Sequence, residues 1–417
     1  MASCGNNGML GLAVLATSLF VVTEFGCSAD NSNGTSTDVQ VHDIGAIDDD
    51  GDSGDLDTMT PDVVQAPTGP CPVVQSSVLA TSVGQPASWD VSRAPQGIVV
   101  AVPTPTGITI GYLADGESAF EDTHIESATL GIGAVVAVAV AAMSESVVLA
   151  MVTNDNPHLK VIKLGYDGSL ANGGIVQTVA GLGEPATSIR FAAAGVDSLG
   201  LVAVSGSTVP TAYGFVLGSA DGKKLFGPIV LGSSVVSGIA EAVASENSIS
   251  AVFHTAEPLP KIVRSTFDVS GKLMDMESVL ADGGGFGAIE APFGAYESSS
   301  GIGITLFAKT DGTPVPRGGY LVRQTIPAVP FAPDALWTAA AAASDGDDVF
   351  AVWRADGVIW GQWIDDAGEV LDEPITLGGE QSKAGHLRAL AQGDSRYLTI
   401  WGSSSGLHVE IVDCSIP

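Results

Sequence analysis

Basic residues are scarce in this chain, which has 16 Lys and Arg against 47 Asp and Glu in 417 residues. The formal net charge is −31, and the first basic residue is Arg93. Proteins that bind nucleic acids or anionic membrane surfaces need clustered Lys and Arg to contact phosphates. The sequence therefore disfavours nucleic acid as a partner, and the acidity favours a protein kept soluble by its charge.

Charged residues of both signs are few, at 15% of the chain, whereas hydrophobic residues make up 45% and 52 residues are Gly. Long surface helices need Lys and Glu along a polar face, so a mainly helical protein is disfavoured. A chain rich in Val, Ala, Gly, Ser and Thr instead favours many short strands joined by tight turns. We therefore predict an all-β fold.

Apolar runs long enough to span a bilayer are absent from the N-terminal region. Met9 to Val22 is apolar or small at fourteen positions, the length of a signal-peptide core, whereas a membrane helix needs about 20 residues. Gly26-Cys27 then resembles the end of a bacterial lipoprotein signal peptide, in which a small residue precedes the Cys that is acylated. The resemblance implies a signal peptide over 1–27, a lipid on Cys27 and a place in the cell envelope, at the outer membrane or in the periplasm.

Two features depart from that pattern. Glu24 stands where an apolar residue is usual, and Met1 to Gly8 holds no Lys or Arg. Cleavage by an ordinary signal peptidase and retention as an uncleaved anchor therefore stay open beside lipidation.

An acidic segment follows over 28–70, with ten Asp and no Glu, Lys or Arg. Such a segment cannot bury enough apolar surface to offset its ordering entropy, so we predict a disordered linker. Asp48, Asp50 and Asp52 alternate as in a calcium loop, but Ser53 stands where the loop needs Gly and Met59 where it needs Glu. They are weak candidates, and we expect no metal site.

A repeat of about 50 residues runs through the rest of the chain. Seven segments begin with an apolar, alternating stretch, near Ser88, Ala134, Ser188, Gly238, Ala288, Leu336 and His386. This period is that of a four-stranded propeller blade. We predict a seven-bladed β-propeller over 71–417, with six or eight blades as alternatives.

The sixth unit shows the pattern of one blade best. Two strands, Asp348–Trp353 and Val358–Ile364, precede an Asp turn that contains Gly368 and an outer strand that ends at Leu377. This order of an "AVW" strand, a "GQ" strand, a Gly-containing turn and an "L" strand resembles a repeat of bacterial secreted β-propellers. The same turn recurs at Asp115-Gly116, Asp167-Gly168, Asp221-Gly222 and Ser270-Gly271.

The seventh unit lacks its fourth strand. His386–Ala391, Tyr397–Trp401 and Leu407–Val412 supply three strands before the chain stops. Val73–Ala80, at the front of the domain, is the free strand that could complete this blade. We therefore predict that the ring closes by adding an N-terminal strand to the last blade.

Only four Cys are present. Cys4 lies in the predicted signal peptide and Cys27 at its end, which leaves Cys71 and Cys414 at opposite ends of the domain. The predicted closure places these two side by side, and disulfides form outside the cytoplasm. We predict that Cys71 and Cys414 form a disulfide.

Local motifs for catalysis are weak. Ser404 sits in a formal G-x-S-x-G, but between two predicted strands, whereas a nucleophile elbow needs a following helix. The dipeptide Trp89-Asp90 occurs once and does not recur as it would in WD repeats. The His residues are scattered along the chain, and two of them, His254 and His386, could lie near the ring axis. No phosphate-loop or dinucleotide motif is visible, and we expect no cofactor.

Two functions remain. The first is a non-enzymatic binding or scaffold protein at the envelope, with a protein or glycan partner. The alternative is a glycan hydrolase or lyase with its residues at the central channel. A channel lined by small apolar residues such as Ala339–Ala343 favours binding, and clustered carboxylates or His with shifted pKa values would favour the enzyme.

Overall fold

The computed structural model describes residues 71–81, 88–193, 197–245, 247–255, 261–280, 286–289, 293–298, 301–310, 318–323, 326–332, 337–346, 348–365, 369–371, 373–378, 386–403 and 405–415. All belong to one compact unit, Val63–Pro417. The predicted signal peptide and linker lie outside the described residues, and so do the candidates Cys27, Asp48, Asp50, Asp52 and Ser404.

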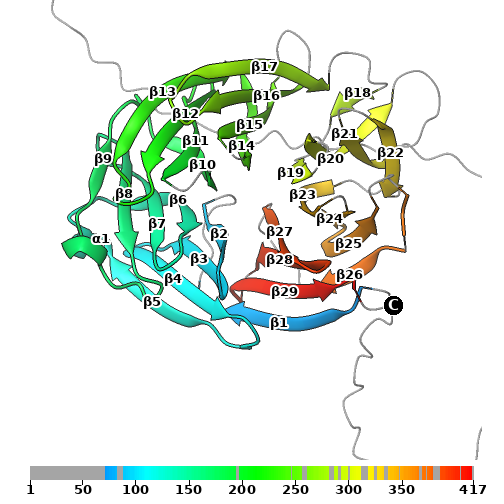
Figure 1. Cartoon of the computed structure of the whole chain (residues 1–417), viewed down its shortest axis with the longest axis horizontal. Coiled ribbons are helices and arrows are strands. Elements are labelled where there is room, and N and C mark those ends of the chain that lie inside the picture. The colour runs from blue at the N-terminus through cyan, green and yellow to red at the C-terminus, as the bar shows by residue number, and fades with distance from the viewer. Residues whose placement is uncertain are drawn as a thin grey trace, which may run out of the picture. The chain divides into compact units, whose positions relative to one another are not determined.

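Seven small antiparallel sheets stand in a ring around a central axis, so the fold is the predicted seven-bladed β-propeller (Figure 1). The first three blades follow the chain from the inner to the outer strand. Blade 1 is β2 (Asp90–Ala94), β3 (Gly97–Pro103), β4 (Gly107–Ala114) and β5 (Glu121–Glu126). Blade 2 is β6 (Val135–Ala142), β7 (Val147–Thr153), β8 (Leu159–Leu164) and β9 (Gln177–Val179). Blade 3 is β10 (Ala186–Ala193), β11 (Ser198–Ser205), β12 (Thr211–Gly218) and β13 (Lys224–Ser233).

The other four blades continue the ring. Blade 4 is β14 (Val235–Ser245), β15 (Ser248–Thr255), β16 (Lys261–Asp268) and β17 (Leu273–Leu280). Blade 5 is β18 (Phe286–Ile289), β19 (Gly294–Ser298), β20 (Gly301–Thr310), β21 (Gly318–Arg323) and β22 (Ile326–Ala332). Blade 6 is β23 (Trp337–Asp345), β24 (Asp348–Ala355), β25 (Val358–Ile364) and β26 (Ile375–Gly378). Blade 7 is β27 (Leu387–Gly393), β28 (Arg396–Gly402), β29 (Leu407–Asp413) and β1 (Val73–Leu79).

Helix is limited to two short turns in the described residues, α1 (Ser127–Leu130) and a 3₁₀ turn over Ala171–Gly173. No described helix is long and apolar enough to cross a membrane.

The apolar core lies between blades rather than within one of them. Each blade packs on both faces, so β3 and β7 are buried at every residue. One apolar cluster joins Ile110 of blade 1 to Leu149 of blade 2, and another joins Ile98 of blade 1 to Ile400 of blade 7. Burial on two faces explains why the strands read as nearly continuous apolar runs.

The predicted turns link the third and fourth strands of their blades. Gly116, Gly168, Gly222 and Gly271 all have positive φ, between 68° and 82°. At Asp221 the carboxylate also accepts a hydrogen bond from the backbone N–H of Lys223 at 2.9 Å. The recurrence of Asp-Gly or Ser-Gly is therefore explained by one left-handed turn used repeatedly.

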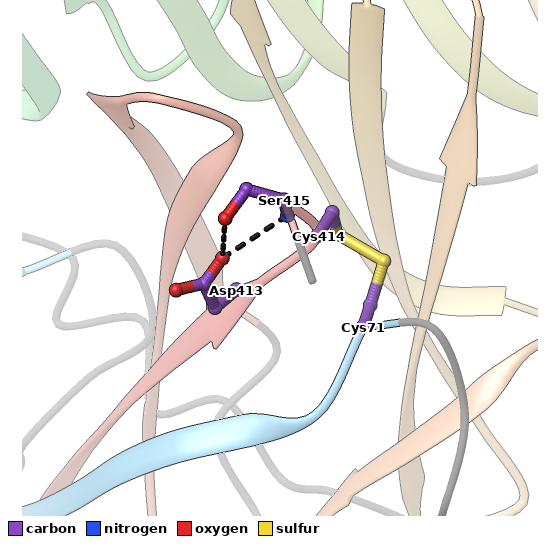
Figure 2. The surroundings of a disulfide bond; sticks show 4 residues. All are labelled: Cys71, Asp413, Cys414 and Ser415. Carbon is purple, nitrogen blue, oxygen red and sulfur yellow. Dashed lines mark hydrogen bonds between the residues drawn. A yellow bond between two sulfur atoms is a disulfide. The ribbon is translucent and has the colours of Figure 1, made fainter. Parts of the chain in front are cut away.

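The ring closes as predicted. Strand β1 pairs with β29 in antiparallel register, with Ser77 opposite Val409 and Leu79 opposite Leu407, and lies beside it at the rim (Figure 1). Cys71 and Cys414 form a disulfide across this seam, as Figure 2 shows. It is compatible with an extracytoplasmic location.

Polar contacts beside the disulfide hold the C-terminal end in place. The carboxylate of Asp413 accepts hydrogen bonds from Ser415, drawn in Figure 2, and from Nε of Arg396 at 2.7 Å. Burial raises the pKa of Asp413, but these hydrogen bonds outweigh it and hold the pKa below its ordinary value. The backbone N–H of Asp413 also donates to the carbonyl of Pro72 at 3.1 Å. The two ends of the domain are thus joined by strand pairing, a disulfide and this hydrogen bond.

Blade 5 departs from the predicted pattern. The sequence predicts one inner strand near Ala288, but two short strands, β18 and β19, both pair with β20. Strand β19 comes so close to blade 6 that a Cβ on Gly294 would lie 2.5 Å from the backbone of Ala341. A Gly at this position permits the approach of the two inner strands.

Replacing Gly294 by Ala should destabilise the protein by about 1–3 kcal/mol, because the backbone of Ala341 must move to admit a methyl group. Urea unfolding followed by fluorescence measures the loss. Gly183→Ala is the matched control, because a Cβ there meets nothing within 4 Å. Equal stability of the two variants would contradict the close approach.

Candidate binding site at the central channel

The innermost strands face the channel with an edge that no strand of their own sheet covers. Blade 1 covers part of this edge on blade 2. The backbone N–H of Val140 donates to the carboxylate of Asp90 at 3.1 Å, and that of Ala142 to the hydroxyl of Ser92 at 3.0 Å. Each donor lies 50 residues after its acceptor, so the repeat itself sets this contact.

Four charged side chains from four blades meet at the channel. Arg388 of blade 7 is ion-paired with Glu241 of blade 4 and lies 3.4 Å from the carboxylate of Asp90 of blade 1. Nε of Arg190, on blade 3, lies 4.0 Å from the carboxylate of Glu241. We call Asp90, Arg190, Glu241 and Arg388 the axial charge cluster.

His386 lies against this cluster. Nη2 of Arg190 lies 2.6 Å from Nε2 of His386, and Trp89 contacts the imidazole edge-on with ring centroids 5.0 Å apart. Because a guanidinium only donates, Nε2 of His386 accepts this hydrogen bond. Burial, reinforced by Arg190 and Arg388, lowers the pKa of His386 well below its ordinary value. His386 is therefore neutral, and its predicted place near the axis is confirmed.

The cluster is electrically balanced, with two arginines against two carboxylates. Burial raises the pKa of Asp90, although Arg388 and Arg190 act in the opposite direction. Burial alone would lower the pKa of Arg388, but Glu241 and Asp90 raise it above its ordinary value. Asp90 is 1% exposed and Arg190 is fully buried, so the cluster stands mostly out of reach of solvent.

A cavity of about 250 Å³ lies next to the cluster, lined by β14, β19, β23 and β27. We call it the axial pocket. Its walls are largely methyl groups, from Ala242, Ala244, Ala295, Ala340, Ala341, Ala342, Ala343, Ala389 and Ala391. Three charged side chains line it: Glu241, Arg388 and Glu297. The predicted stretch of small apolar residues in blade 6 thus does line the channel.

A second cavity of about 200 Å³ lies between blades 4 and 5 and shares Val243, Ala244 and Glu297 with the axial pocket. We call it the side pocket. Its lining is rich in hydroxyls, from Ser245, Ser248, Ser250 and Thr266. Arg264, its one basic side chain in the described lining, is ion-paired with Glu277 of the next strand.

Of the residues considered for catalysis, Asp90 and His386 lie at the axial charge cluster, and Ser404 lies outside the described residues. In the connection from β28 to β29, the N–H of Ser403 donates to the carbonyl of Gly406 at 2.7 Å. His254 lies on β15, the second strand of blade 4, where burial lowers its pKa. Within the described ranges, no group of three or more His, Cys, Asp or Glu could hold a metal ion.

Sequence reasoning missed the axial charge cluster. The dipeptide Trp89-Asp90 does not by itself predict a charge cluster, and no local motif contains Arg190, Glu241 or Arg388. The sequence does contain a signal for this cluster. Charged residues interrupt the apolar inner strands at nearly the same position of the 50-residue repeat, at Asp90, Arg190 and Glu241. Charges that interrupt apolar inner strands in this way indicate contacts across the axis.

Glu410 is a half-buried residue away from the channel, and its Oε2 is inaccessible to solvent. It lies on β29 directly opposite Thr399, on the face of blade 7 that packs against blade 6. Among the described residues, neither its Oε2 nor the hydroxyl of Thr399 has a hydrogen-bond partner. Burial raises the pKa of Glu410 to about 7.

Stability should therefore fall as the pH rises from about 4.5 to about 7, because the folded state holds a proton on Glu410 that the unfolded chain releases earlier. Glu410→Gln should raise the free energy of unfolding at about pH 8 by about 1–3 kcal/mol and change it little below about pH 4.5. Urea unfolding at the two pH values measures this. Glu121→Gln, an exposed change of equal charge, should show no such difference. A gain for Glu410→Gln that is equal at both pH values would contradict the buried proton.

Comparisons with known proteins place the fold. No family model matches the chain, and no curated protein matches it. The BP39L lectin from Burkholderia pseudomallei is similar in structure, with a TM-score of 0.57 and 17% identity over 80% of this chain and 97% of that one. A hydrazine synthase chain from Kuenenia stuttgartiensis has a TM-score of 0.50 and 10% identity over 81% of this chain and 99% of that one.

A third similar structure is an α-L-arabinanase from Penicillium chrysogenum, with a TM-score of 0.48 and 9% identity over 82% of this chain and 98% of that one. At these identities the likenesses to the lectin and to the hydrazine synthase chain show the fold alone.

Proposed function

We propose that this protein is exported, held at the bacterial cell envelope by a lipid on Cys27, and that its propeller binds a glycan in the axial pocket. The observation that carries binding is the pocket itself: an alanine-walled recess next to a charge cluster that is already neutralised. Because these charged groups are paired with each other, we interpret them as part of a rigid pocket wall rather than as reacting groups.

The size of the axial pocket favours a small unit of a larger ligand. At about 250 Å³ it falls below the range of about 300–1,000 Å³ that is typical for drug-sized ligands. A single sugar ring at the end of a glycan is of suitable size. The fold likeness to a lectin makes glycans the first ligands to test, although such a likeness does not assign a ligand.

Two observations favour a glycan hydrolase as the second candidate. Asp90 and His386, whose pKa values are shifted by burial, lie together at the axial charge cluster. Glu241 and Glu297 line the same pocket, and burial raises the pKa of Glu297, while Glu241 is paired with Arg388. Two carboxyls in different environments are the usual pair of glycosidases. We favour binding over hydrolysis because one of these two carboxylates, that of Glu241, already accepts a hydrogen bond from Arg388.

The proposal is tested by applying the mature protein to an array of bacterial and plant glycans. Ala389→Phe should weaken binding at least about tenfold, because a ring at this half-buried position fills the axial pocket. Ala128→Phe, on the exposed helix α1, is the matched control and should bind normally. Equal binding by both variants would contradict the axial pocket as the site. Release of shortened glycans that stops in Glu241→Gln would favour the hydrolase.

Lipid attachment is tested separately. Mass spectrometry of the protein from its native envelope should find an acylated N-terminal Cys27 and no peptide from residues 1–26. An unmodified peptide that spans Cys27 would contradict the anchor.

A further inference from the structure

Glu297 is the acidic residue shared by the two pockets. It lies on β19, the short inner strand of blade 5, and lines both the axial pocket and the side pocket. Its side chain is exposed, unlike the carboxylates of the axial charge cluster. A ligand that occupies either pocket would therefore meet Glu297.

Glu297 also differs from the other charges of the pockets in having no partner of opposite sign. Arg388 is paired with Glu241 and Asp90, and Arg264 is paired with Glu277. Among the described residues, no Lys, Arg or His side chain lies within the 4.0 Å ion-pair distance of Glu297. Partial burial therefore raises the pKa of Glu297, because no nearby cation acts in the opposite direction. A negative charge left over in this way favours a cationic group on the ligand.

The charge of the whole molecule acts in the same direction. At a net charge of −31, the protein attracts cations and repels anions over the distance of approach. Acidic sugars are thus disfavoured at a site whose leftover charge is itself negative.

The side pocket supplies groups suited to sugar hydroxyls. Ser250 and Thr266 are hydrogen-bonded to each other at 2.9 Å, and Ser245 and Ser248 at 2.7 Å. Each hydroxyl keeps further capacity to donate or accept. Hydroxyls on one side of Glu297 and methyl groups on the other match a sugar ring, which has polar edges and apolar faces.

We propose that the ligand is a glycan unit with a free, protonated amino group, and that Glu297 binds this ammonium group at the junction of the two pockets. The inference rests on the proposed binding of a glycan and adds its chemical class: an amino sugar that is not acetylated, rather than a neutral or acidic sugar.

Three disaccharides with the same linkage test this, namely the β-1,4-linked dimers of glucosamine, N-acetylglucosamine and glucose. Calorimetry at about pH 6.5, where most of the sugar amine is protonated, gives the affinity of the full mature protein for each. The glucosamine dimer should bind at least about tenfold more tightly than the other two. Glu297→Gln should remove this preference, and Glu121→Gln, which changes the net charge equally on the outer strand β5, should keep it.

Thermal unfolding of each variant checks that the fold is retained. Equal affinity for the three dimers, or a preference that Glu297→Gln and Glu121→Gln reduce alike, would overturn the role of Glu297 and leave glycan binding standing. Failure of all three dimers would overturn the amino-sugar assignment. Failure of every glycan on the array as well would overturn the proposed function itself.

Discussion

Replacing Cys71 by serine should lower the free energy of unfolding by about 5 kcal/mol, the largest loss expected for any single change in this protein. The disulfide joins residues 343 positions apart, so its removal releases almost the whole domain in the unfolded state. The chain-entropy account makes the gain from a cross-link grow with the loop that it closes. Both cysteines are also 4% exposed, so the bond is part of the packed seam of blade 7.

The variants Cys71→Ser, Cys414→Ser and the double replacement should be equally unstable, because each of them lacks the same bond. Urea unfolding with and without a reductant measures this, and the reduced native protein should approach the variants. Losses that add up in the double variant would show that the two cysteines act independently and would contradict the bond.

Replacing Arg388 by methionine should lower the free energy of unfolding by about 3–5 kcal/mol, the second large effect. Arg388 is the cation for both Glu241 and Asp90, which come from blades 4 and 1. Without it, Asp90 stays buried at 1% exposure, and Arg190 is left as the one cation of the cluster for two carboxylates. Leaving a buried charge without its partner costs far more free energy than the intact ion pair contributes to stability.

A rescue variant separates this cause from a simple loss of packing. Arg388→Met combined with Asp90→Asn restores the charge balance, because Arg190 still lies 4.0 Å from the carboxylate of Glu241, and it should recover a large part of the loss. Arg93→Ala is the surface control: its partner Asp115 is exposed, and the expected loss is below about 1 kcal/mol. Similar losses for Arg93→Ala and Arg388→Met would contradict a buried axial cluster.

The architecture was largely predictable, because its determinants are local and repeated. A turn such as Asp221-Gly222 has the same chemistry wherever it occurs, and apolar alternation marks each strand. The closing strand was predictable by elimination, since blade 7 lacked one strand and Val73–Leu79 was free. Cys71 and Cys414 followed from that closure.

The candidate site was mostly not predictable. Asp90, Arg190, Glu241 and Arg388 meet only after the ring has closed. Their shared phase in the repeat indicates that they face the axis, but it does not tell which of them form ion pairs. The split inner strand of blade 5, which places Glu297 at the junction of the pockets, breaks the repeat rather than following it. Repetition therefore reveals the scaffold, and departures from repetition mark the site.

The central claim is that the two ends of the propeller are joined to each other in an oxidising compartment. Peptide mapping by mass spectrometry, on the unreduced protein from its native envelope, tests this most directly. The account predicts one cross-linked peptide pair containing Cys71 and Cys414, which disappears on reduction. Free thiols at both positions, or a bond from either cysteine to another partner, would contradict it.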